Sequence, residues 1–195
     1  MLCVVSGQVE GAGKTAIISR MIAETSHAGW AAVRIQTRTH PQCLPQDGIC
    51  WTEEVVANSR TEAGIYLAAG AKRAWSLKLR GASLGPALPY VRRLVAEHEN
   101  VVVETVSPLP ELGAELSLYV TARSEQASLP APWLAYIDAF VTLDTSHGAS
   151  SLRGSRPVHV VNPATYSSKA LINMLQERLR PHVPPPSKVS ILASL

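Results

Sequence analysis

A glycine-rich segment near the N-terminus carries the residue types that bind phosphate. Residues 11–15 read Gly-Ala-Gly-Lys-Thr and follow the apolar run Leu2–Val5. Small residues let backbone N–H groups approach a phosphate, and the positive end of a following helix attracts the anion. Lys14 supplies a mobile cation for the β- and γ-phosphate oxygens, and the Thr15 hydroxyl can bind Mg²⁺. The segment therefore predicts a P-loop that binds a nucleotide, GTP or ATP, with Mg²⁺.

The first glycine of the usual P-loop spacing is displaced in this chain. Counting back from Gly13, that position falls on Gln8, and the nearest glycine is Gly7. The loop is either one residue longer than usual or entered in a different shape. The residues predicted to bind the nucleotide are Gln8, Val9, Glu10, Gly11, Ala12, Gly13, Lys14, Thr15 and Ala16.

An acidic residue ends a second apolar run, and a P-loop needs such a partner. Residues 101–105 read Val-Val-Val-Glu-Thr, which predicts a buried strand ending near Glu104. An unpaired buried carboxylate is costly, and a hydrated Mg²⁺ ion near Thr15 would offset that cost. Glu104 is therefore predicted to hold Mg²⁺ or to orient the attacking group. The alternative is that Glu104 caps the strand and pairs with a basic side chain.

Polar residues follow the strand predicted over residues 31–36. In parallel sheets, ligands gather at the carboxyl ends of the strands, so the segment 36–40 is expected near the γ-phosphate. Arg38 could stabilise phosphate charge there, and His40 could bind a metal or transfer a proton. With Lys14 and Glu104, Arg38 completes the predicted catalytic set. A solvated loop with unrelated polar groups is the alternative interpretation.

Apolar runs alternate with helical patterns along the chain, which predicts an α/β fold: a P-loop NTPase domain with a mostly parallel central sheet and helices on both faces. Strands are predicted over residues 2–6, 31–36, 74–79, 100–105, 116–122, 139–144 and 157–161. Helices are predicted over residues 14–28, 53–71, 83–99, 132–138 and 167–180, with a long loop over 37–52. Residues 1–180 are expected to form one domain, followed by a proline-rich tail over 181–195.

The composition limits the classes of partner. Hydrophobic residues make up 46% of the 195 and charged residues 17%, which is typical of a globular chain. A net charge of +3 without long basic runs does not favour a nucleic-acid partner. A membrane partner is not expected either, because no stretch approaches the roughly 20 apolar residues of a membrane span. With no evident signal peptide and only three cysteines, the expected compartment is a reducing cytoplasm.

Three segments together resemble a known family. The strand and loop over residues 2–15, the stretch Thr61–Ala71 and the run Val102–Glu104 are similar to MobB, the nucleotide-binding adaptor of molybdopterin guanine dinucleotide synthesis. The likeness covers about residues 1–123 and is closest to uncharacterised MobB-like proteins. It implies a fold related to SIMIBI-class GTPases, slow hydrolysis of a Mg²⁺-bound nucleotide and frequent homodimers. On that pattern Lys14 and Thr15 contact phosphate and Mg²⁺, and Glu104 is their acidic partner.

Two features of the sequence differ from MobB. Thr105 stands where MobB has a glycine, and residues 142–145 read Thr-Leu-Asp-Thr instead of an Asn-Lys-x-Asp guanine motif. GTP and ATP therefore both stay open as the nucleotide.

The segment 37–52 also carries potential ligands for a second metal. His40, Cys43 and Cys50 are three soft ligands that zinc or iron could use, with a fourth ligand from water or a partner. Two ordinary free thiols are the alternative.

Three functions are compatible with these residues. The first is a slow nucleoside triphosphatase that assists molybdenum-cofactor or metal-centre assembly beside a cofactor-assembly enzyme. The second is a small-molecule kinase, with the loop of residues 37–50 as its acceptor pocket. The third is a non-enzymatic adaptor whose loop changes order with the γ-phosphate. Product analysis separates these functions, because only a kinase transfers the phosphoryl group to an acceptor other than water.

Overall fold

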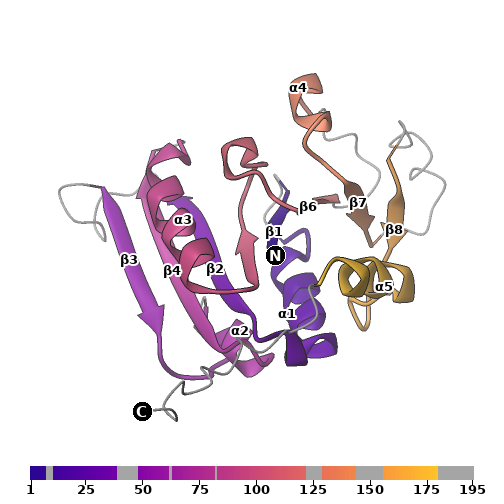
Figure 1. The fold of residues 1–195 in the computed structure, drawn as a ribbon, viewed down its shortest axis with the longest axis horizontal. Helices are drawn as coiled ribbons and strands as arrows, with labels where there is room; N and C mark the ends of the chain where they lie inside the picture. The colour runs from indigo at the N-terminus through magenta and orange to yellow at the C-terminus, as the bar shows by residue number, and fades with distance from the viewer. Residues whose placement is uncertain are drawn as a thin grey trace, which may run out of the picture.

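The computed structural model describes residues 1–7, 11–38, 48–61, 63–81, 83–121, 129–143 and 156–179, except for the side chain of Arg38. Eight strands in this part of the chain form one sheet. Their order is β3-β4-β2-β5-β1-β6-β7-β8 (Figure 1). All neighbours run parallel except β3 and β4, which are antiparallel. The strands are β1 (Leu2–Ser6), β2 (Ala31–Arg38), β3 (Ile49–Glu54), β4 (Arg73–Arg80), β5 (Val101–Glu104), β6 (Leu116–Thr121), β7 (Ala139–Thr142) and β8 (Val158–Val160).

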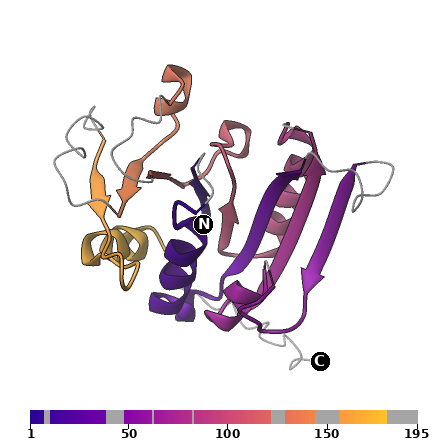
Figure 2. The same cartoon turned by 180° about the vertical axis from the view of Figure 1, so that it is seen from behind.

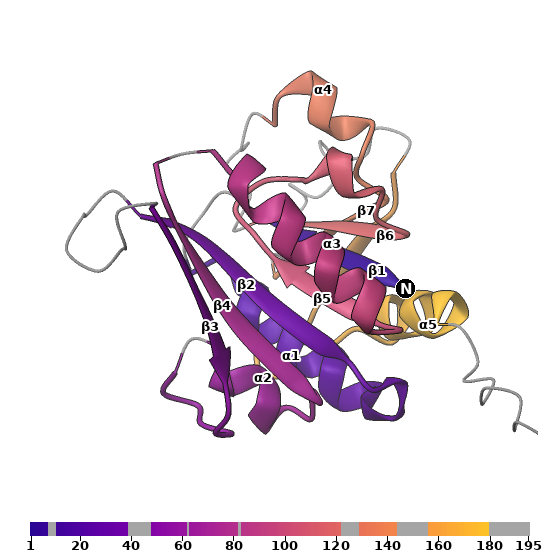
Figure 3. The same cartoon turned by 60° about the vertical axis from the view of Figure 1, so that its left-hand side comes forward.

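Helices cover both faces of this sheet. The α-helices are α1 (Lys14–Glu24), α2 (Gly64–Ala68), α3 (Leu88–Glu97), α4 (Ala131–Leu134) and α5 (Lys169–Arg178), and the 3₁₀ turns are η1 (Ser26–Ala28), η3 (Gly85–Ala87) and η4 (Pro110–Leu112). In Figure 1 α3 lies in front of β4 and β2, and in Figure 2 these strands lie in front of α3. Figure 3 shows α1 and α2 on the opposite side of the sheet from α3.

Two apolar cores result from the alternation of side chains along the strands. Val102 of β5 packs in the core that includes Ile17 and Ile18 of α1, whereas Val103 packs in the core that includes Val91 of α3. Glu104 lies two residues after Val102, so its side chain is on the same face of the sheet, toward α1.

The topology brings the ends of two strands together. β1 pairs with β5 on one side and β6 on the other, and Val5 is level with Glu104. After β1 the chain crosses to β2, on one side of the β1–β5 pair, whereas after β5 it crosses to β6, on the other side of that pair. Such a reversal leaves a crevice at the carboxyl ends of the strands, where ligands bind in α/β sheets. The first turn of α1 lies at this crevice, because Thr15 contacts Glu104 at the end of β5.

The predictions for residues 37–71 were wrong in two places. The predicted loop over 37–52 contains the end of β2 and most of β3, and the described residues of the predicted helix over 53–71 are helical only in α2. β3 forms because it pairs with β4 and because Trp51 stacks on Trp75 (centroids 5.9 Å apart) and on Tyr90 (5.2 Å). The turn before α2 requires Gly64, since a Cβ atom there would lie 2.1 Å from the Thr61 hydroxyl.

Most other predicted elements are confirmed with shifted ends. β1 has the predicted bounds, and α1 begins at Lys14 as expected. α1 stops at Glu24, because Thr25 leaves the helical conformation (φ −129°, ψ 34°); its hydroxyl donates to the Met21 carbonyl and accepts from the indole N–H of Trp30. No helix of the described residues is long and apolar enough to cross a membrane. The predicted tail over residues 181–195 lies outside the described residues.

Candidate functional site

The turn before α1 exposes the N-terminus of that helix to the crevice. Gly11 and Gly13 have φ angles of 77° and 89°, a left-handed conformation that glycine adopts without steric cost. No side chain in the described part of the chain caps this end, and the first turn contains no acidic residue. The first N–H groups of a helix lack partners within the helix, so they can bind an anion here.

Lys14 turns back across the loop and is buried, with 8% of its surface exposed. Its Nζ donates a hydrogen bond to the Gly7 carbonyl oxygen at 2.7 Å. This contact keeps the ammonium group between the end of β1 and the start of α1. A phosphate bound at the helix N-terminus would therefore lie within reach of the ammonium group.

Gly7 occupies the point where the chain leaves β1. A Cβ atom at this position would lie 2.5 Å from the carbonyl oxygen of Val120 in β6. A backbone oxygen cannot move aside as a flexible side chain can. The entry to the loop therefore requires glycine at residue 7, one position before the usual first glycine of a P-loop.

We expect Gly7→Ala to lower the free energy of unfolding by roughly 1–3 kcal/mol, the usual cost of overpacking a tight site. Urea denaturation monitored by circular dichroism measures the change. Gly85→Ala is the matched control, because among the described residues its Cβ atom would meet only the Ser83 hydroxyl, at 3.4 Å. Equal stability of the Gly7→Ala variant and wild type would contradict the close approach to Val120.

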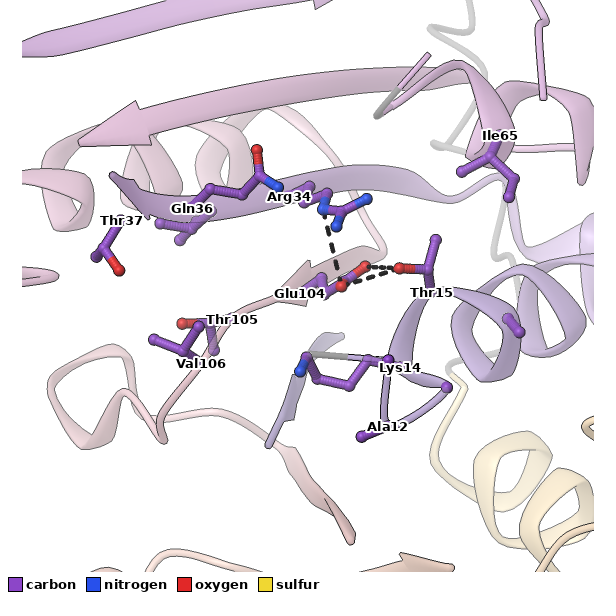
Figure 4. A pocket seen from close by; sticks show the side chains of 14 residues that line it. Ala12, Lys14, Thr15, Arg34, Gln36, Thr37, Ile65, Glu104, Thr105 and Val106 are labelled. Carbon is purple, nitrogen blue, oxygen red and sulfur yellow. Dashed lines mark hydrogen bonds and ion pairs between the residues drawn. The ribbon is translucent and has the colours of Figure 1, made fainter. Parts of the chain in front are cut away.

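Glu104 lies at the centre of a polar cluster between α1, α2 and β2. Thr15 Oγ1 lies 3.0 Å from Glu104 Oε1 and 2.9 Å from Oε2, and the Tyr66 hydroxyl donates to Oε2. Arg34 Nε lies 3.8 Å from Oε1. The dashed lines in Figure 4 mark the contacts of Glu104 with Thr15 and Arg34. These partners offset the cost of a carboxylate that is only 4% exposed.

Tyr66 is fixed as the donor in its contact with Glu104. Burial raises the pKa of the Tyr66 hydroxyl well above its ordinary value, and the neighbouring Glu104 carboxylate raises this pKa further. The hydroxyl is therefore protonated throughout the physiological range of pH. The proton of this hydrogen bond belongs to Tyr66, and the carboxylate is the acceptor.

A pocket of about 640 Å³ joins these groups. It lies within the usual range for small-molecule sites, roughly 300–1,000 Å³. Its walls come from the turn and first residues of α1, from β2, from α2 and from the end of β5: Gly11, Ala12, Gly13, Lys14, Thr15, Ala16, Arg34, Ile35, Gln36, Thr37, Ile65, Glu104, Thr105 and Val106. Two cationic side chains, Lys14 and Arg34, therefore line one cavity at a helix N-terminus.

The oxygen atoms of Thr15 and Glu104 fit the requirements of Mg²⁺. This ion prefers hard oxygen ligands, and its octahedral shell at about 2.0–2.1 Å places neighbouring ligands about 3 Å apart. The distances of 2.9 and 3.0 Å between the Thr15 hydroxyl and the two Glu104 oxygens match that spacing. One hydroxyl and one carboxylate leave the remaining ligand positions to water and phosphate.

The structure brings many of the predicted site residues together. The nucleotide-binding residues predicted over 11–16 and the acid Glu104 all line the pocket. The predicted residues Gln8, Val9, Glu10, His40 and Cys43, and the side chain of Arg38, lie outside the described part of the chain.

The predicted zinc or iron site is described only at Cys50. This residue lies in β3, with its Sγ atom 3.7 Å from Thr52 Oγ1. Within the described ranges, no three His, Cys, Asp or Glu side chains form a group that could hold a metal ion. The site that would combine Cys50 with His40 and Cys43 stays a prediction.

Sequence reasoning missed Arg34 and Tyr66. A charged residue within the apolar strand 31–35 needs a buried partner, and this signal could have drawn attention to Arg34. Tyr66 lies in an alanine- and glycine-rich stretch that gave no sign of its contact with Glu104. Both contacts arise between segments far apart in the sequence.

No protein-family model matches the chain, and a search of curated proteins finds no significant match. The resemblance to MobB therefore stays a prediction.

Proposed function

We propose that the chain is a P-loop NTPase that binds Mg²⁺ and GTP or ATP and hydrolyses the nucleotide slowly. The observation that supports this most is the meeting of Lys14, Thr15 and Glu104 at the N-terminus of α1, beside a pocket of about 640 Å³. From the resemblance to MobB we further propose that the protein assists molybdenum-cofactor or metal-centre assembly, with a cofactor-assembly enzyme as its partner and as a homodimer.

Each residue has a role that follows from its position. The first-turn N–H groups of α1 would bind phosphate oxygens, and Lys14 would exchange the Gly7 carbonyl for oxygens of the β- and γ-phosphates. Thr15 and Glu104 would hold Mg²⁺. When bound, Mg²⁺ neutralises the charge that develops on the β- and γ-phosphate oxygens. Catalysis then consists of positioning the phosphates and stabilising the charge that develops on them.

Arg34 is a second cation for this chemistry, in addition to the predicted Arg38. Its side chain lines the pocket and is 26% exposed. The 3.8 Å separation from Glu104 is longer than a hydrogen bond, so the pair is not locked together by a short directional contact. We propose that the Arg34 guanidinium stabilises negative charge on the terminal phosphate.

A small-molecule kinase is the second candidate, because the pocket extends past the phosphate-binding end. Gln36 and Thr37 line it along β2, and a strand rises about 3.3 Å per residue, so Thr37 lies about 10 Å beyond Arg34. In Figure 4 Thr37 lies at the left of the view and Thr15 to the right of centre. That polar extension would accommodate an acceptor next to the terminal phosphate.

Incubation of the purified protein with Mg²⁺ and GTP, or with Mg²⁺ and ATP, tests the proposed activity. We expect slow release of inorganic phosphate and diphosphate nucleotide in equal amounts. Native mass spectrometry of the protein as purified shows which base is retained. A phosphorylated small molecule in place of inorganic phosphate would favour the kinase, and tight nucleotide binding without turnover would favour the adaptor. Absence of nucleotide binding would overturn the proposal.

A further inference from the structure

We propose that Tyr66 is a positioning residue, which would hold the Glu104 carboxylate in place for Mg²⁺ beside Thr15. This inference rests on the proposed function and deepens it, because it assigns a role at the metal site to a residue outside the P-loop and outside β5.

The two hydroxyl groups reach Glu104 from different elements. Thr15 belongs to the first turn of α1, whereas Tyr66 belongs to α2 in the connection between β3 and β4. Both contact Glu104 Oε2, and Thr15 also contacts Oε1. The Tyr66 side chain is 1% exposed and lies in the core between α1 and the sheet. Its hydroxyl is therefore held in a fixed place beside the carboxylate.

Metal binding would give the Thr15 hydroxyl two tasks, because its oxygen would bind the cation while its proton remains the donor to Glu104. A hydroxyl that offers its oxygen to a cation must point its proton away from that cation. Holding the carboxylate in place then falls also to the other partners that the described structure gives it, Tyr66 and Arg34.

Tyr66 is better suited to this task than Arg34. Arg34 Nε is 3.8 Å from Glu104, so it supplies charge without a directional hydrogen bond. Its positive charge also competes with the metal for the carboxylate. The Tyr66 hydroxyl is neutral and donates directly to Oε2. It orients the carboxylate and leaves its negative charge available to the ion.

The backbone around Tyr66 keeps α2 in one position. The Gly64 N–H donates to Thr61 Oγ1 at 3.1 Å before the helix, and the Ala71 N–H donates to the Tyr66 carbonyl at 2.9 Å after it. These contacts anchor a five-residue helix on both sides of Tyr66. The helix that presents the hydroxyl is thus tied by hydrogen bonds on both sides, which favours a positioning role.

Tyr66→Phe tests the proposal, because it removes the hydroxyl and keeps the ring. The probe is Mn²⁺, whose free concentration is followed by electron paramagnetic resonance as it binds the complex of protein and nucleoside diphosphate. A hydrogen bond to a charged group predicts a loss of Mn²⁺ affinity of about tenfold or more. Affinity for the diphosphate without metal is expected to change less than about twofold. Tyr90→Phe is the control, since Tyr90 packs on Trp51 in the core on the other face of the sheet.

A double-mutant cycle with Glu104→Gln separates positioning from a general structural effect. If Tyr66 acts through the Glu104 carboxylate, Tyr66→Phe lowers Mn²⁺ affinity far less in the Glu104→Gln background than in wild type. Equal losses in both backgrounds, or wild-type affinity in the single variant, would overturn the role of Tyr66 while nucleotide binding stands. A wild-type protein that binds neither nucleotide nor Mn²⁺ would overturn the proposed function itself, and this inference with it.

Discussion

Replacing Lys14 with alanine is expected to abolish measurable nucleotide binding. The Lys14 ammonium group is buried beside the N-terminus of α1, where it donates to the Gly7 carbonyl. A hydrogen bond to a charged group contributes roughly 1.5–3 kcal/mol, and Lys14 would contact two phosphates, so affinity should fall by about 100-fold to 10⁴-fold. Equilibrium titration with a fluorescent GTP or ATP analogue measures the loss.

Lys169→Ala is the matched control for this variant. Lys169 is also the first residue of a helix, α5, but its side chain is exposed and it does not line the pocket. Both variants lose one positive charge, so a general effect of net charge would weaken binding in both. Circular dichroism establishes that each variant is folded. Unchanged affinity in a folded Lys14→Ala protein would contradict the P-loop assignment.

Glu104→Gln is expected to remove the dependence of phosphate release on Mg²⁺. It should also slow hydrolysis by about 10²–10³-fold, a typical loss when one charge-stabilising group is removed. Glutamine keeps the size of the side chain and can still accept from Thr15 and Tyr66, but it lacks the negative charge that the ion needs. Affinity for nucleotide without metal should stay close to that of wild type. Phosphate release measured over a range of Mg²⁺ concentrations tests the first two expectations, and equilibrium titration with a fluorescent nucleotide analogue without metal tests the third.

Glu111→Gln provides the comparison for Glu104→Gln. Glu111 lies in η4 with an exposed side chain, and it does not line the pocket. This substitution should leave both the Mg²⁺ requirement and the rate of hydrolysis unchanged. A Glu104→Gln protein that retains the wild-type Mg²⁺ response would show that the carboxylate does not hold the ion.

The sequence predicts the strand, turn and helix at the P-loop end of the candidate site well, because the signals for them are local. The strand Leu2–Ser6, the glycine turn and the helix beginning at Lys14 all come from one short stretch. The valine run likewise predicts the buried strand that ends at Glu104. Parallel pairing between β1 and β5 then brings the two segments together, as the general topology of α/β sheets leads one to expect.

The rest of the site depends on contacts that no local pattern encodes. Arg34 meets Glu104 because β2 pairs with β5 in a register that places the two residues level. Tyr66 meets Glu104 because α2 packs against the same face as α1. β3 was missed for a related reason: it is an edge strand, held by pairing with β4 and by the stacking of Trp51 on Trp75 and Tyr90.

The most direct test of the proposed function is a calorimetric titration of nucleotide-free wild-type protein with GTP and with ATP, each with and without Mg²⁺. We predict saturable binding of one nucleotide per chain, tighter with Mg²⁺ than without it, and no detectable binding to Lys14→Ala. Absence of binding by either nucleotide, or equal binding by wild type and Lys14→Ala, would contradict the proposed function.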